Sequence, residues 1–164
     1  EIWSYTPAAD GEPQAQWQLA GRMAVPRAFL GTVVVNDQLY VVGGFDGQRE
    51  VARADVYDLT SRRWRSLPPM AVARSGFSLV YDGVAIVALG GGWLDTVTTD
   101  ERFDPVIEAW SNFPSPLPGS WRHLGAASID GKIFLMGGWS GGYLDANAQY
   151  QSTFRALLPV ITGP

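Results

Sequence analysis

The chain has 164 residues, of which 46% are hydrophobic and 17% are charged, and its formal net charge is −4. This composition is typical of a globular chain that is long enough to bury a core, and it argues against intrinsic disorder. The negative charge argues against a nucleic-acid-binding surface. The absence of cysteine excludes disulfides, thiol nucleophiles and thiolate metal sites.

Neither a membrane span nor a signal peptide is visible in the sequence. No run of about 18 apolar residues occurs, so we expect no membrane-spanning helix. The chain opens at Glu1 and not at methionine, which favours the removal of an upstream segment. The compartment stays open, and an extracellular or periplasmic location remains among the options because exported proteins can also lack cysteine.

One pattern of glycines and aromatic residues returns at a nearly constant interval along the chain. Its three occurrences are Gly43-Gly44, Tyr57 and Trp64; Gly92, Phe103 and Trp110; and Gly138 and Tyr150. The aromatic residues are spaced by 46 or 47 residues. Self-similarity at such a period is typical of a repeat architecture and predicts three copies of one structural unit.

Each copy opens with two apolar runs joined by a short polar turn. The expected strand pairs are 29–35 with 38–42, 77–81 with 84–89, and 124–129 with 132–136. Asn36-Asp37, Asp82-Gly83 and Asp130-Gly131 separate the members of each pair, and such dipeptides favour tight hairpin turns. The second strand of each pair is apolar without alternation, which predicts burial on both faces.

This pattern of double glycine, later aromatic residue and still later tryptophan resembles the kelch repeat. The resemblance covers nearly the whole chain and implies an all-β fold of kelch-type β-propeller blades, each with four antiparallel strands. Large aromatic side chains would fill the space between neighbouring blades. We expect outer strands of a partial blade at 1–20, blade 1 at 22–69, blade 2 at 70–117, and blade 3 with a C-terminal tail at 118–164.

The third copy departs from the pattern because Leu157 stands where a tryptophan is expected. The total is about three and a half blades, whereas propellers have about 4–8. We therefore expect an incomplete ring in this chain, closed by a continuing chain or by self-association.

Arginine recurs just before the first strand of each unit, at Arg27, Arg74 and Arg122, with spacings of 47 and 48 residues. One interpretation is a ring of guanidinium groups at the channel mouth that clamps a carboxylate or a sulfate. The alternative is a repeated structural pairing with a neighbouring blade's backbone or with an acidic side chain.

Aromatic residues also stand in the loops that follow the glycine pairs, at Phe45, Trp93, Trp139 and Tyr143. Loop aromatics on a rigid scaffold are natural anchors for a binding partner. The alternative is that these side chains pack locally over the ends of the blades.

His123 is the single histidine of the chain, and it follows Arg122 directly. It is either a general base or a surface or packing residue. A second histidine for a metal site is missing, so we expect no catalytic residue, no metal and no cofactor.

Some proteins that resemble kelch propellers are enzymes. The galactose oxidase family holds copper with two histidines and two tyrosines, one of them crosslinked to cysteine, and this chain has one histidine and no cysteine. No catalytic motif of the propellers that isomerise sialic acid has a match. The segment 137–142, GGWSGG, lacks the ending of a phosphate-binding loop.

The sequence therefore predicts a binding module, and not an enzyme, that presents its loops to a protein or glycan partner. Two alternatives stay open. The chain could form part of a sugar-directed enzyme of the isomerase type whose catalytic residues lie elsewhere, or it could be a structural assembly subunit.

Overall fold

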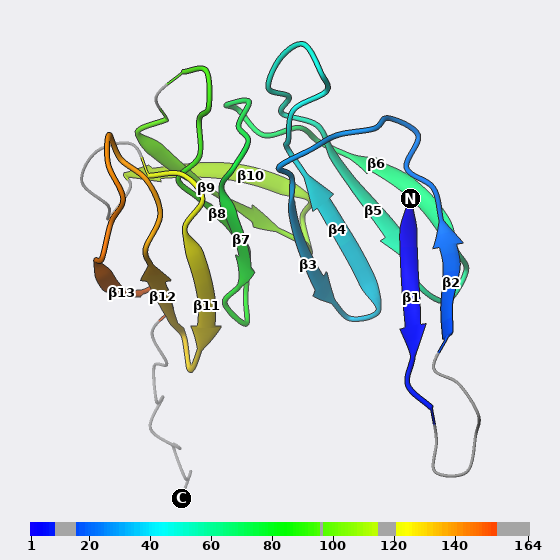
Figure 1. Cartoon of the computed structure of the whole chain (residues 1–164). Coiled ribbons are helices and arrows are strands. Elements are labelled where there is room, and N and C mark those ends of the chain that lie inside the picture. The colour runs from blue at the N-terminus through cyan, green and yellow to red at the C-terminus, as the bar shows by residue number, and fades with distance from the viewer. Residues whose placement is uncertain (9–15, 96, 115–120, 154–164) are drawn as a thin grey trace, which may run out of the picture.

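The computed structural model describes residues 1–8, 16–95, 97–114 and 121–153 (Figure 1). Within these ranges the chain folds into β-strands joined by turns and loops, without an α-helix. The described residues therefore contain no helix that could cross a membrane. The all-β prediction is confirmed.

The strands form four antiparallel sheets that follow one another in chain order. The N-terminal pair consists of β1 (Ile2–Thr6) and β2 (Gln16–Gly21). The first sheet consists of β3 (Gly31–Val35), β4 (Gln38–Val42), β5 (Ala54–Asp58) and β6 (Arg63–Leu67). The second sheet consists of β7 (Ser78–Tyr81), β8 (Ile86–Leu89), β9 (Thr99–Asp104) and β10 (Ala109–Pro114). The third sheet consists of β11 (Gly125–Ile129), β12 (Lys132–Met136) and β13 (Asn147–Gln151).

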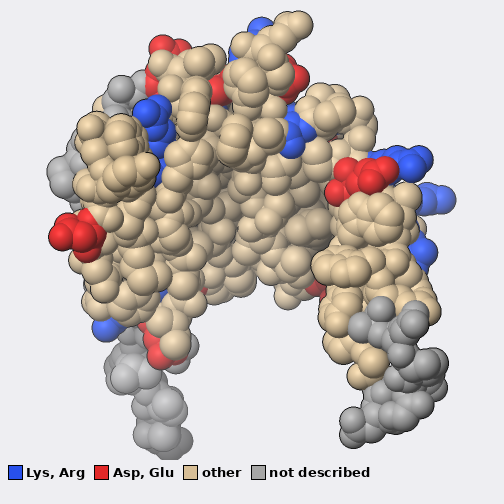
Figure 2. Space-filling view, viewed as in Figure 1, with Lys and Arg blue, Asp and Glu red and all other residues tan. Residues whose placement is uncertain are grey.

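The sheets are arranged along an arc, and β3, β7 and β11 are the strands through which neighbouring sheets meet (Figure 1). Figure 2 shows the same arc in space-filling form, open between the N-terminal pair and the third sheet. The fold is thus a series of propeller blades whose ring is not closed, as the repeat pattern predicted.

The hairpin turns follow the sequence signals at two of the three expected places. Asn36 and Asp37 both have positive φ, of 48° and 58°, as a tight two-residue turn requires. Asp130 and Gly131 have the same geometry, with φ of 51° and 72°. At the third place the prediction of a two-residue turn is wrong, because Asp82 instead forms a wider loop.

The Asp82 carboxylate accepts hydrogen bonds from the backbone N–H groups of Val84, at 2.9 Å, and Ala85, at 2.8 Å. An aspartate that bonds to the backbone two or three residues further on stabilises its own turn. As a result β8 begins at Ile86, two residues later than the apolar run suggested.

The recurring aromatic residues lie opposite each other in neighbouring outer strands. Tyr57 pairs with Trp64, and Phe103 pairs with Trp110, with ring centroids 4.9 Å and 5.1 Å apart. Tyr5 and Trp17 repeat this arrangement in the N-terminal pair, at 5.1 Å. These two strands are therefore the counterparts of β5 and β6. The expected outer strand around Leu157 lies outside the described residues.

The hydrophobic core lies between the sheets. One cluster joins the first and second sheets through residues such as Val56, Phe77 and Phe103, and a second cluster joins the second and third sheets. All four residues of β8 are buried, which confirms that this central strand is covered on both faces. Burial of apolar surface on both sides is what holds stacked sheets together.

The glycine pairs allow the connection into the next sheet to approach closely. A Cβ atom at Gly43 would lie 2.6 Å from the carbonyl oxygen of Arg74, and one at Gly90 would come even closer to that of Trp121. Both glycines also have positive φ, of 62° and 67°, which glycine adopts without strain. Gly43 and Gly90 are therefore required by the packing of one sheet against the next.

Candidate binding site

The segments that enter β3, β7 and β11 are joined by backbone hydrogen bonds from one sheet to the next. Gly76 N–H donates to the Phe29 carbonyl at 2.8 Å, and His123 N–H donates to the Gly76 carbonyl at 2.6 Å. All three residues have positive φ, of 54°, 62° and 54°. Phe29, Gly76 and His123 are therefore equivalent positions, 47 residues apart, and each of them stands just before the first strand of its sheet.

The hydrogen-bond register corrects the predicted arginine series. Gly44 N–H donates to the Arg74 carbonyl at 2.9 Å, and Gly91 N–H donates to the Trp121 carbonyl at 2.6 Å. Trp121, and not Arg122, is therefore the structural equivalent of Arg74. The spacing of 48 instead of 47 residues shows that Arg122 is displaced by one position.

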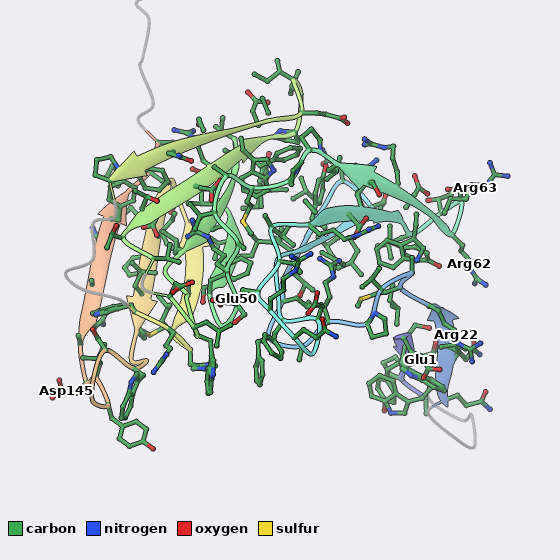
Figure 3. All side chains as sticks on the ribbon, turned by 90° about the horizontal axis from the view of Figure 1, so that it is seen from above. Glu1, Arg22, Glu50, Arg62, Arg63 and Asp145 are labelled. Atoms are coloured by element: carbon green, nitrogen blue, oxygen red, sulfur yellow. The ribbon has the colours of Figure 1, made fainter. Side chains whose placement is uncertain are left out.

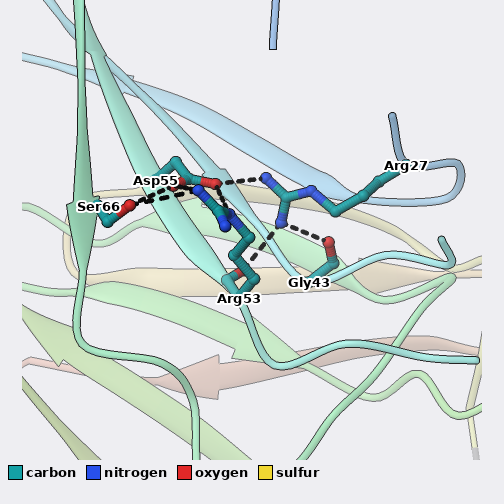
Figure 4. A network of polar contacts seen from close by, with 5 residues as sticks. All are labelled: Arg27, Gly43, Arg53, Asp55 and Ser66. Carbon is teal, nitrogen blue, oxygen red and sulfur yellow. Dashed lines mark hydrogen bonds and ion pairs between the residues drawn. The ribbon is translucent and has the colours of Figure 1, made fainter. Parts of the chain in front are cut away.

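Arg27 is buried within the first sheet and takes no part in a channel mouth. Its guanidinium donates to the Asp55 carboxylate at 2.8 Å and to the carbonyl oxygens of Gly43 and Arg53 at 2.9 Å and 3.0 Å (Figure 4). The Asp55 carboxylate also accepts from Arg53 and from the Ser66 hydroxyl. Arg27 thus ties the glycine-pair loop to β5.

Arg74 repeats this arrangement in the second sheet with its side chain completely buried. Its guanidinium donates to the Glu101 carboxylate at 2.8 Å and to the carbonyl oxygens of Gly90 and Thr99, each at 3.0 Å. Burial lowers the pKa of Arg74, and the Glu101 carboxylate opposes that shift. The acidic side chain that the structural alternative expected is thus present at Arg27 and Arg74, but the backbone acceptors belong to the same sheet and not to a neighbouring blade. Both guanidinium groups are buried in their sheets and are not exposed to an anionic ligand.

The third sheet has lost both members of this pair. Val41, Ala88 and Leu135 are equivalent positions on β4, β8 and β12. The residue paired with this position is Asp55 in the first sheet and Glu101 in the second, but it is Ala148 in the third. Trp121 stands in the place of the arginine and is buried in the core between the second and third sheets, against which Ala148 packs. An apolar pair has thus replaced an ionic one.

Arg122 differs from the two buried arginines because its guanidinium lies near the surface of the molecule, beside the Trp93 loop. It donates to the carbonyl oxygens of Gly92 and Trp93, at 3.5 Å and 3.1 Å, and its guanidinium carbon lies 5.1 Å from the centroid of the Trp93 ring. Within the described residues no carboxylate lies within ion-pair distance of Arg122. A cation over an indole face is stabilised by the ring quadrupole, but its charge is not neutralised.

Three rings pack together beneath Arg122. Phe29 and Trp93 are stacked, with centroids 5.9 Å apart and planes 5° from parallel, and the His123 ring meets both of them edge-on. A Cβ atom at Gly76 would lie 3.0 Å from the His123 ring. The absence of a side chain at this position therefore makes room for the histidine.

A cavity of about 650 Å³ lies beside these rings. Trp139 and Tyr143 form its other wall, with their rings edge to face at 5.1 Å. Trp93 and Tyr143 are exposed by 50% and 93% of their surface. The lining residues are Phe29, Trp93, Arg122, His123, Gly138, Trp139 and Tyr143.

Five of the eight predicted binding residues line this cavity: Trp93, Arg122, His123, Trp139 and Tyr143. Arg27 and Arg74 lie buried in their sheets, and Phe45 is held in backbone bridges to Ala28 and Glu50 away from the cavity. Phe29 was missed because the apolar run 29–35 was interpreted as strand throughout. Phe29 lies 47 residues before Gly76 and 94 before His123, and this spacing could have identified it as the equivalent of His123.

The described residues contain no group of three or more His, Cys, Asp and Glu side chains that could hold a metal ion. In the same part of the chain, His123 has ring contacts but no carboxylate within hydrogen-bonding distance. The arrangement of cation, aromatic rings and open cavity is suited to binding.

Comparison with known proteins adds evidence from sequence. A family model described as the Kelch motif matches residues 26–71, which include the first sheet and Arg27. Kelch-like protein 35 of Mus musculus is 35% identical over 108 residues, which are 65% of this chain and 19% of that protein. The chain belongs to the kelch-repeat family.

Two further relatives match a larger share of this chain. The F-box/kelch-repeat protein SKIP20 of Arabidopsis thaliana is 33% identical over 144 residues, 79% of this chain and 34% of that protein. Alpha-scruin of Limulus polyphemus is 28% identical over 151 residues, 84% of this chain and 15% of that protein. The matched kelch region thus spans about a third or less of each of these relatives.

Proposed function

We propose that this chain is a kelch-repeat binding module that captures a segment of another protein in the cavity beside Arg122. The observation that carries the proposal is the pairing of exposed aromatic walls with a cation that no described carboxylate neutralises. Trp, Tyr and Arg are the residue types enriched at the energetic centres of protein interfaces. All three types meet here on loops that the packed sheets hold in place.

The chemistry of the cavity favours a partner segment with a carboxylate next to an apolar side chain. The rings of Phe29, Trp93 and Trp139 offer an apolar surface to such a side chain. Arg122 retains donors for a carboxylate, and charge-assisted hydrogen bonds of this kind are roughly twice as strong as neutral ones. A cationic segment would be repelled by the same guanidinium.

The experiment is a selection of random displayed peptides on the protein, after which the binding of the enriched peptides to Trp139→Ala protein is measured in parallel. We expect the enriched peptides to place an acidic residue beside an aromatic or aliphatic one. Their affinity should fall by about tenfold or more in Arg122→Gln, the change expected when a charged partner is lost. Equal binding to Trp139→Ala, or enrichment of basic peptides, would contradict the proposal.

A glycan is the second candidate ligand, favoured by the large exposed ring of Tyr143 together with Trp93. Such aromatic faces can cover the apolar face of a sugar ring. A glycan array probed with the protein and with Tyr143→Ala distinguishes the two ligands. Binding to a sugar class that is lost in the variant, without peptide enrichment, would favour the glycan.

We further propose that other blades complete the open ring, from a continuing chain or from a second copy. Large apolar side chains are exposed on both flanks of the arc: Trp3, Trp17 and Leu19 on the N-terminal pair, and Ile129 and Met136 on the third sheet. Soluble monomers rarely expose large contiguous apolar patches. Light scattering on the 17.8 kDa chain tests this, and a monodisperse monomer that melts cooperatively would contradict it.

A further inference from the structure

We propose that Glu50 is the residue that positions Trp93, so that the cavity keeps its shape only while the Glu50 carboxylate is ionised. The inference rests on the proposed function, since it concerns the same cavity. Glu50 lies outside the cavity lining and comes from the loop between β4 and β5. In Figure 3 it lies in the interior of the arc, far from the outer-edge residues Arg62 and Arg63.

The Glu50 carboxylate gathers hydrogen bonds from two separate segments of the second repeat. One of its oxygens accepts from Ser75 N–H at 2.7 Å, from the Ser75 hydroxyl at 2.7 Å and from Trp93 N–H at 2.8 Å. The other oxygen accepts from Leu94 N–H at 3.2 Å. A single side chain of the first sheet's loop thus holds both the entry into β7 and the loop that carries Trp93.

The backbone conformation before Trp93 and the backbone bridge at Glu50 both favour this contact. Gly91 and Gly92 have φ of 97° and 91°, a conformation that turns the following N–H groups of Trp93 and Leu94 toward one carboxylate. Glu50 itself is anchored by its antiparallel bridge to Phe45. This anchoring gives Phe45 a role in supporting Glu50.

Without Glu50, the N–H groups of Trp93 and Leu94 would lose their acceptor, and the Trp93 wall would be held by its ring contacts and by the hydrogen bonds from Arg122 to the Gly92 and Trp93 carbonyl oxygens. The indole ring stacks on Phe29 and lies under Arg122, but half of its surface is exposed. Loops with few buried contacts open at low free-energy cost. Loss of the carboxylate would therefore allow Trp93 to leave the cavity while the sheets stay folded.

The protonation state of Glu50 controls this arrangement. Burial raises the pKa of Glu50, but the hydrogen bonds from Trp93, Ser75 and Leu94 outweigh burial and hold the pKa below its usual range. Because the folded-state pKa is lowered, the stabilisation is complete above the ordinary carboxyl range and is lost as pH falls through the lowered pKa. The cavity should therefore lose its Trp93 wall under acidic conditions.

Other charged groups lie on the segments that meet at this carboxylate, and their effect on the pH dependence must be separated from that of Glu50. They are Asp46 and Arg49 on its own loop, Arg74 on the segment that enters β7, Asp95 on the loop of Trp93, and Arg122 and His123 beside the Trp93 ring. These groups are present in both the parent protein and Glu50→Gln, so the difference between the pH dependences of the two proteins reports on Glu50.

The test follows Trp93 directly by fluorine NMR of the protein labelled with fluorotryptophan, with Trp93→Phe to assign its signal. We expect Glu50→Gln to shift the Trp93 signal and to abolish its movement at acidic pH. Glu108→Gln is the matched control, because Glu108 is an exposed carboxylate that pairs with Arg65 at 2.8 Å in another part of the chain. It should leave the Trp93 signal and its pH dependence unchanged.

A second variant keeps the test decisive if Glu50→Gln folds poorly. Ser75→Ala removes one of the four hydrogen bonds to the carboxylate and should shift the Trp93 signal in the same direction by a smaller amount. An unchanged Trp93 signal in both variants, or a parent signal that does not move with pH, would overturn the inference.

The peptides selected on the cavity separate this inference from the proposed function. Their affinity should fall by about tenfold in Glu50→Gln, in parallel with the displacement of Trp93. If Trp93→Phe and Trp93→Ala both bind these peptides as the parent does, the proposed function fails. The NMR result would then still decide the role of Glu50.

Discussion

The second and third sheets carry different residue types at the positions that connect the entry segment of a sheet to its third strand. In the second sheet, Arg74 and Glu101 form a fully buried ion pair that ties the glycine loop to β9. In the third sheet, Trp121 and Ala148 occupy the corresponding places and join an apolar core. The neighbouring Arg122 is then left at the rim, with its charge directed to the cavity. The comparison separates an arginine that is paired inside its sheet from one that lines the cavity.

The largest expected effect is the loss of the acid in the second sheet. Glu101→Ala removes the carboxylate that lies 2.8 Å from the buried Arg74 guanidinium and leaves Asp100, at 4.0 Å, in the more distant ion pair. It also removes the acceptor of the Ala71 and Val72 N–H groups. We expect a loss of about 3–5 kcal/mol in the free energy of unfolding, as for one partner of a buried ion pair.

Denaturant unfolding of the Glu101→Ala variant measures this loss. The control is Glu108→Gln, an exposed partner of Arg65, which should change stability by about 0.5 kcal/mol or less. Equal midpoints for the two variants would show that the Arg74 pair is not a structural element.

Most of the fold could be predicted from the sequence because the repeated residues perform repeated packing tasks. The glycine pairs admit the next sheet, and each outer aromatic residue lies opposite its partner, as Tyr57 lies opposite Trp64. The wider turn at Asp82 was not predicted, since an Asp-Gly dipeptide does not show whether the carboxylate will bond to the following backbone.

The candidate site was predicted only in part, for physical reasons. Loop aromatics such as Trp93 and Trp139 follow the glycine pairs and could be located by that spacing. The role of Arg122 depends on a displacement of one residue, which is present in the sequence as a spacing of 48 instead of 47 residues and is established by the hydrogen-bond register. Glu50 binds backbone N–H groups 25 and 43 residues away, and such contacts leave no signature in side-chain types.

The next prediction tests whether the apolar pair Trp121 and Ala148 of the third sheet can be replaced by an ion pair like that of the other two sheets. Trp121→Arg alone places a charge in the apolar core of the third sheet and should be strongly destabilising. Adding Ala148→Asp restores the acid at the position that Asp55 occupies in the first sheet. We expect the double variant to be more stable than the sum of the two single changes predicts, by about 0.5–3 kcal/mol.

A double-mutant cycle on denaturant unfolding gives this coupling energy. Ala126→Asp, on β11 opposite Leu135, provides a control acid away from the expected position. If Ala148→Asp and Ala126→Asp rescue Trp121→Arg equally, the ionic pair does not depend on the register that the first two sheets share.

The smallest expected effect on stability is at Arg122, and this is the sharpest contrast with Arg74. Arg122→Gln removes a half-buried cation that donates to two carbonyl groups and covers the Trp93 ring, but it leaves no buried carboxylate unpaired in the described residues. Its effect on the free energy of unfolding should be about 0.5–1 kcal/mol, within the range of an exposed cation–π contact. The same change should weaken binding of acidic peptides by about tenfold or more. Arg122→Lys is the informative companion, because it keeps the charge while losing the planar donor fork. If Arg122→Gln destabilised the chain as much as Glu101→Ala, Arg122 would be a structural arginine like Arg74, and the distinction between the two sheets would not hold.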